Sequence, residues 1–181
     1  MKMFVSASFA CVLAASAVLA AQEPNPVSSA LRAAMERYEK NIVGAAEIMP
    51  AGKFSTRPTP QQMTFGELVR HVTTGNTMIC SWIAGAQPPP AGELPESAGK
   101  DALVGALRES FASCRSALSA ADDSKLGDEV PFFGGRKVTR AATMLDLAAD
   151  WGDHYSLMAT ELRVAGLLPP TAQRQAKAGG K

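Results

Sequence analysis

Two histidines, the only ones in this 181-residue chain, lie in segments whose apolar residues recur at helical spacing. They are His71 and His154, and Asp150 precedes His154 by one helical turn. Residues four apart project from the same side of a helix, so Asp150 and His154 can reach one point, and His71 joins them if its helix is a neighbour. Two imidazoles and a carboxylate suit a divalent ion such as zinc, nickel, iron or manganese. The spacing therefore predicts a metal site inside a helix bundle, with positions open to water and substrate.

The same residues also have a plainer interpretation. A histidine at the edge of an apolar helix face is often a hydrogen-bonded structural residue, and Asp150 with His154 can form a simple intrahelical ion pair. The sequence has no HExxH or CxxC motif to strengthen the metal assignment. Glu67 stands four residues before His71 and could orient that imidazole. It also completes a helix-capping box with Thr64, which is the interpretation that we favour.

Four predicted helices position these residues. Each has an apolar stripe with spacings of three and four residues, and each begins or ends at capping residues, glycine or proline. The predicted ranges are about 26–49, 65–84, 101–120 and 140–165. Residues 53–63 and 122–137 are expected to be loops, because no strand-like alternation or internal repeat is evident. The fold class is therefore all-α, and four helices of this length predict a four-helix bundle.

The N-terminal segment has the pattern of a signal peptide. Lys2 supplies a positive charge, an apolar run follows over about residues 4–19, and the small residue Ala20 suits a cleavage site, so residues 1–20 are expected to be removed. The run is short for a membrane span, so no stable membrane anchor is expected. A lipid on Cys11 is disfavoured, because the residues before it are a poor lipidation motif. The mature protein is expected to be exported, either periplasmic or secreted.

The mature chain has the length of one domain. We expect this domain over residues 21–170, followed by a polar tail, residues 171–181, that is disordered. The formal net charge is only +1, and no run of lysine or arginine occurs. Nucleic acid is therefore not expected as a partner.

Two cysteines remain after the predicted cleavage, Cys80 and Cys114. Export permits a disulfide between them, which would tie two helices together. Two buried free thiols are the alternative, because cysteine packs well in apolar cores. Neither cysteine has a histidine close by in the sequence to activate it, which argues against a cysteine nucleophile.

Two segments resemble a known family. FGELVRHV at residues 65–72 and the segment 153–170, which holds DHYS and ELRVAGLLPP, resemble the DinB/YfiT-like superfamily, four-helix bundle proteins regarded as metal-dependent enzymes. In that family the positions of His71 and His154 hold ligand histidines, and a third histidine stands where this chain has Asp150. The resemblance implies a His71, Asp150 and His154 ligand set. The family includes thiol S-transferases and a maleylpyruvate isomerase, so the resemblance implies metal-assisted transfer or hydrolysis of an unidentified small molecule. It also allows a homodimer.

The aspartate leaves two other functions open. One is a non-catalytic exported protein that holds a small apolar ligand, or a partner, in a pocket near Trp82, Trp151, Phe132 and Phe133. The other is a stress protein with a degenerate metal site, in which the two histidines only pack. Metal content and bound ligands would separate these functions from a metal-dependent enzyme.

Overall fold

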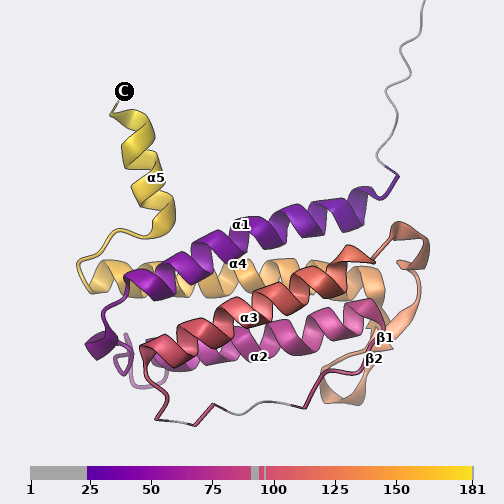
Figure 1. Cartoon of the computed structure of the whole chain (residues 1–181), viewed down its shortest axis with the longest axis horizontal. Helices are drawn as coiled ribbons and strands as arrows, with labels where there is room; N and C mark the ends of the chain where they lie inside the picture. The colour runs from indigo at the N-terminus through magenta and orange to yellow at the C-terminus, as the bar shows by residue number, and fades with distance from the viewer. Residues whose placement is uncertain (1–23, 91–93, 96, 181) are drawn as a thin grey trace, which may run out of the picture.

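Four long helices form the body of the protein, and a shorter fifth helix projects from one end (Figure 1). The computed structural model describes residues 24–90, 94–95 and 97–180. The expected signal peptide, residues 1–20, lies outside the described residues. Among the residues described, no helix combines the length and the apolar character needed to cross a membrane.

The four long helices pack side by side. α1 runs antiparallel to α2 and α3 and parallel to α4 (Figure 1). The direct contacts are between α1 and α3, α1 and α4, α2 and α3, and α2 and α4. Their bounds, α1 Pro26–Ile48, α2 Phe65–Ala84, α3 Lys100–Ser119 and α4 Arg140–Val164, agree closely with the ranges predicted from the apolar stripes. The mostly helical class is thus confirmed, and the two histidine-bearing helices are neighbours.

Local sequence explains where α2 begins and ends. The Thr64 hydroxyl accepts a hydrogen bond from the Glu67 amide at 3.2 Å, and the Glu67 carboxylate accepts one from the Thr64 amide at 2.6 Å. This reciprocal pair is the capping box expected from the sequence, and it lowers the pKa of Glu67. Gly85 ends the helix with a φ of 74°, a left-handed conformation that suits glycine. Glu67 is therefore a capping residue, and the hydrogen bonds of its side chain in the described part of the chain go to Thr64 and Arg57 rather than to His71.

The core lies between the inward faces of all four helices. Trp151 is fully buried, with its ring 6.2 Å from that of Tyr38 on α1 and 6.1 Å from that of Phe111 on α3. A disulfide joins Cys80 on α2 to Cys114 on α3, with the two Cα atoms 5.2 Å apart. Both cysteines are buried, so the bridge lies in the apolar interior and links two parallel helices.

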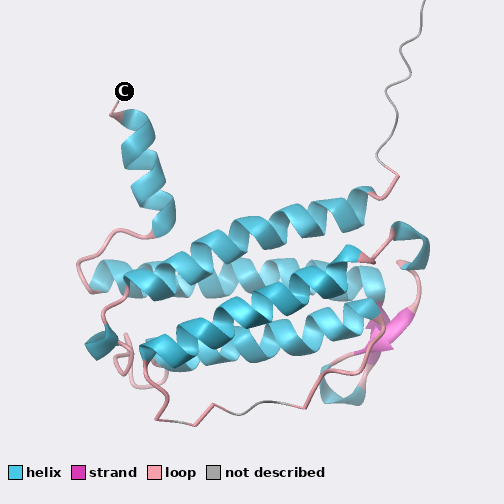
Figure 2. Cartoon of the chain, in the orientation of Figure 1, coloured by secondary structure: helices cyan, strands magenta, loops and turns pink. Residues whose placement is uncertain are grey.

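A small β-hairpin replaces part of the expected loop over residues 122–137. Strands β1 (Glu129–Pro131) and β2 (Lys137–Thr139) pair antiparallel, and they lie at one end of the bundle (magenta in Figure 2). Val130 is only 2% exposed and anchors the hairpin against the helices. The intervening 3-10 turn η3 (Phe133–Gly135) has two glycines with positive φ. Three-residue strands are too short to produce a recognisable alternation in the sequence.

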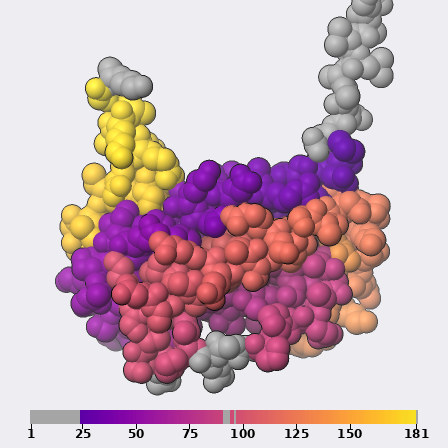
Figure 3. Space-filling model, in the orientation of Figure 1, coloured from indigo at the N-terminus to yellow at the C-terminus, as the bar shows by residue number. Residues whose placement is uncertain are grey.

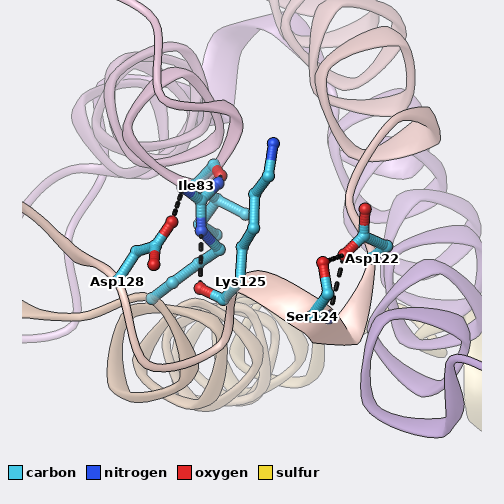
Figure 4. Close-up of polar contacts among 6 residues, drawn as sticks. Ile83, Asp122, Ser124, Lys125 and Asp128 are labelled. Carbon is cyan, nitrogen blue, oxygen red and sulfur yellow. Dashed lines mark hydrogen bonds and ion pairs between the residues drawn. The ribbon is translucent and has the colours of Figure 1, made fainter.

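Arg140 fastens the first turn of α4 to the end of α2. Its guanidinium donates to the backbone carbonyl of Ile83 and, at 3.2 Å, to that of Lys125 in the 3-10 turn η2 (Asp123–Lys125). The Asp128 carboxylate lies 3.7 Å from the same group (Figure 4). Because Arg140 is buried, these oxygens supply the partners that its charge requires.

The C-terminal segment corrects the expectation of a disordered tail at residues 171–181. It forms helix α5 (Pro170–Gly179), which extends away from the bundle in Figures 1 and 3. Pro170 starts the helix, and the Thr171 amide donates to the Tyr155 hydroxyl of α4 at 3.1 Å. These anchors are tertiary contacts, which composition alone does not reveal.

Candidate metal centre

His71, Asp150 and His154 meet on the face where α2 and α4 lie side by side. One ligand atom from each lies within 4.8 Å of the others. The two imidazole rings are 4.8 Å apart between centroids and are inclined by 32°. His71 comes from the second turn of α2, whereas Asp150 and His154 occupy successive turns of α4. The structure thus brings together all three residues that the sequence singled out.

The three side chains differ in their exposure. His154 is buried at 7% exposure, Asp150 is half-buried, and His71 is exposed. The α4 side of the cluster therefore lies in the interior, and its α2 side is accessible to solvent. A site of this kind holds two ligands rigidly and leaves one side accessible to a small molecule.

The backbone of α4 selects the tautomer of His154. Its Nδ1 lies 2.7 Å from the backbone carbonyl oxygen of Asp150, one turn earlier. A carbonyl can only accept, so Nδ1 carries the hydrogen and Nε2 keeps its lone pair. Histidines that bind metals commonly have this arrangement, because the second nitrogen fixes the orientation of the ring. His154 is therefore prepared to bind an ion through Nε2.

Burial and the neighbouring imidazoles have opposite effects on the pKa of Asp150. Burial raises the pKa of its carboxyl group, whereas the neighbouring imidazoles of His154 and His71 lower it. A cation at this point would favour the ionised carboxylate and so relieve the cost of burial. Gly75 of α2 faces the same carboxylate, and a Cβ at that position would lie 3.9 Å from Oδ2. The glycine keeps the space beside Asp150 open.

The donor set fits a divalent ion of the first transition series. Atoms that bind one ion at about 2.1 Å each lie at most about 4.2 Å apart. The three side chains here have donors within 4.8 Å of one another, so small changes in side-chain rotamers would close the set. Two imidazoles and one carboxylate leave coordination positions for water and substrate.

Asn76 is a residue near this site that the sequence analysis did not single out. Its side-chain oxygen accepts a hydrogen bond from the Trp151 indole at 2.7 Å, deep between α2 and α4. Asn76 is 1% exposed and falls on the apolar stripe of α2, between Val72 and Ile79. A polar residue on an apolar stripe was the available signal, because buried amides require partners.

The aromatic residues that suggested an apolar ligand pocket belong to two separate clusters. Trp82 packs against Phe132 and Phe133 of the hairpin, with ring centroids 6.3 and 5.1 Å away. Trp151 lies instead in the core between Tyr38 and Phe111. The four aromatic residues therefore do not surround one shared pocket.

Comparison with known proteins places the fold. A family model described as the DinB superfamily matches residues 34–158, a range that includes all three candidate ligands. The structure is similar to those of DinB-like proteins from Bacillus subtilis (17% identity, TM-score 0.64, covering 76% of this chain and 92% of that one) and Bacillus cereus (20%, 0.62, 75% and 91%). It also resembles a variant of the mycothiol-dependent maleylpyruvate isomerase (15%, 0.59, 72% and 60%). No curated protein matches the sequence.

Proposed function

The chain belongs to the DinB superfamily, and on that basis we propose that it is an exported metal-dependent enzyme of the transferase or hydrolase type. The observation that carries the proposal is the convergence of His71, Asp150 and His154 within 4.8 Å on the α2–α4 face of the four-helix bundle. The isomerase with a similar fold is mycothiol-dependent by name, which shows that this fold can serve an enzyme that uses a small thiol.

Each of the three residues has a definite role in this proposal. His154 binds through Nε2 while its Nδ1–H remains bonded to the Asp150 carbonyl. Asp150 supplies a carboxylate, and exposed His71 completes the set from α2. A divalent ion held there would supply Lewis-acid chemistry, lowering the pKa of a bound water or thiol toward neutrality. The substrate, an unidentified small molecule, approaches from the open α2 side.

Asp150 also bears on which metal is bound. It stands where the family resemblance implies a histidine, so the set becomes two imidazoles and one carboxylate. Carboxylates favour harder cations, and this set is the usual one for non-haem iron(II) and suits manganese. Zinc and nickel should also be tested, and we expect this site to bind them more weakly than a site of three histidines would.

Two features support export. The sequence of residues 1–20 has the pattern of a signal peptide. The Cys80–Cys114 disulfide is typical of proteins that reside in oxidising compartments. Cytosolic low-molecular-weight thiols would not be the natural cosubstrates there, so the hydrolase version is favoured over the thiol-transferase version.

Metal analysis of the purified mature protein tests the proposal. We expect about one divalent ion per chain in the wild type, lost in His154→Ala and kept in Asp153→Ala, an exposed neighbour that is not part of the cluster. A wild type without metal that gains one in Asp150→His would mean that the site has degenerated. The alternative, a non-catalytic binding protein, would then be the better description.

A further inference from the structure

We propose that Asn76 is a positioning residue of the metal centre: its hydrogen bond with Trp151 sets the height and rotation of the ligand-bearing turns of α4 relative to His71. This inference rests on the proposed function for its biological meaning. The effect of Asn76 on the relative position of α2 and α4 can be measured without any metal.

The bond belongs to a buried polar chain across three helices. The Trp151 indole N–H donates to the Asn76 oxygen at 2.7 Å, and the Asn76 amide nitrogen donates to the Ser110 hydroxyl at 3.1 Å. Ser110 donates in turn to the Leu107 carbonyl at 2.8 Å. Exposure is 0% for Trp151, 1% for Asn76 and 4% for Ser110. Each donor has an acceptor, so the orientation of the Asn76 amide is fixed.

Both ends of this bond adjoin the metal centre. Trp151 follows Asp150 directly and precedes His154 by less than one turn. Asn76 follows Gly75, the residue of α2 that faces the Asp150 carboxylate. A change in the Trp151–Asn76 contact would therefore move Asp150 and His154 relative to His71.

Apolar packing alone would hold this geometry less tightly. Contacts among aliphatic side chains are non-directional, whereas a buried indole N–H that loses its acceptor destabilises the folded state. Among the described residues, the other hydrogen bond between α2 and α4 is that of Arg140 to the Ile83 carbonyl, and Arg140 lies about 16 Å along α4 from Trp151, at 1.5 Å per residue. Metal ligands must be placed within about 0.5 Å. The Asn76 bond is the directional contact close enough to α4's ligands to provide that accuracy.

Three variants of the mature protein test the inference. Asn76→Leu removes the bond from α2 with a modest change of volume, and Trp151→Phe removes it from α4 with a smaller aromatic ring. Ser110→Ala is the matched control, because it breaks the same buried chain but leaves the Trp151–Asn76 bond in place. The dissociation constants for Mn²⁺, Zn²⁺ and Co²⁺ are measured for each, together with the Co²⁺ absorption spectrum and the urea midpoint.

We expect all three variants to unfold at lower urea concentration. Only Asn76→Leu and Trp151→Phe should bind metal at least about tenfold more weakly, the usual effect of losing a group that orients a ligand, with an altered Co²⁺ spectrum. Affinities within twofold of the wild type in Asn76→Leu, or equal weakening in Ser110→Ala, would overturn the inference.

The failure of the proposed function gives a different result. If the wild type binds none of the three ions, the metal proposal fails, and crystal structures of metal-free wild type and Asn76→Leu decide the positioning role. We expect the separation between the Cα atoms of His71 and His154, which does not depend on the rotamer of exposed His71, to change by more than about 0.5 Å in the variant. An unchanged separation would refute that role as well.

Discussion

The rings of His71 and His154 lie 4.8 Å apart between centroids, although they belong to helices that are far apart in the chain. His154 is held from within by the Asp150 carbonyl, whereas His71 is exposed. One imidazole is thus fixed and the other can adjust. This asymmetry suits a site that must accept an ion and a small molecule from solvent, and it leads to the first prediction.

Metal ions should stabilise the folded protein through these three residues. A ligand that binds only the folded state at 100 times its dissociation constant adds about 2.7 kcal/mol. We expect a divalent ion to raise the melting temperature of the wild type and of Asp153→Ala, and to leave that of His154→Ala unchanged. Differential scanning calorimetry with and without a chelator measures this effect, and an equal rise in all three proteins would point to binding elsewhere.

Two substitutions of Gly75, to alanine and to leucine, should affect metal binding differently. A Cβ there would meet the Asp150 Oδ2 at 3.9 Å, an ordinary van der Waals distance. Gly75→Ala should therefore stabilise the interior of α2 by about 0.5–1 kcal/mol without weakening metal binding. Gly75→Leu should fill the space beside the carboxylate and weaken binding. Urea unfolding and metal titration of the pair give both results, and unimpaired binding in Gly75→Leu would show that this space is not needed.

Glu161 should make stability fall as pH rises. It is 7% exposed, lies against a cavity of about 100 Å³ that Lys53 and Arg57 also line, and its carboxyl group has no hydrogen bond or ion pair in the described part of the chain. Burial raises its pKa to about 7. The folded state therefore binds a proton more tightly than the unfolded state, and the stability present below about pH 4.5 is lost as pH rises toward 7.

The matched variant for this effect is Glu161→Gln. At about 1.4 kcal/mol per pKa unit, the titration of Glu161 should contribute a loss of up to about 3 kcal/mol over that interval in the wild type. The glutamine variant should lose correspondingly less, and the difference between the two unfolding free energies should widen with pH. Parallel curves for the two proteins would mean that Glu161 is not the titrating group.

The Cys80–Cys114 bridge should contribute measurable stability. It closes a loop with a sequence separation of 34 residues, for which a contribution of about 2–4 kcal/mol is typical. Dithiothreitol should lower the urea midpoint of the wild type and leave that of a Cys80→Ala/Cys114→Ala double variant unaffected. A wild type that is insensitive to reductant, despite complete reduction, would show that packing around the two sulfur atoms suffices.

Much of the helical framework follows from local sequence. The Thr64–Glu67 capping box, Gly85 and the spacing of three and four between apolar residues define α2, because caps and amphipathic stripes act within a few residues. The same local periodicity placed Asp150 and His154 on one side of α4. The hairpin and α5 were not predicted, because Val130 and Thr171 are held by partners that are distant in the chain.

By itself, then, the sequence determined four helices, the identities of the three candidate ligands and the pairing of Asp150 with His154 on one helix side. The tertiary structure alone decided that His71 faces them, that Asn76 bonds Trp151, and that the carboxyl group of Glu161 is buried with no hydrogen bond or ion pair to a described residue. The physical reason is the distance along the chain over which each kind of interaction acts. Hydrogen bonds and stripes within a helix are fixed by neighbours in the chain, whereas the relative height and rotation of two packed helices depend on how every side chain between them fits.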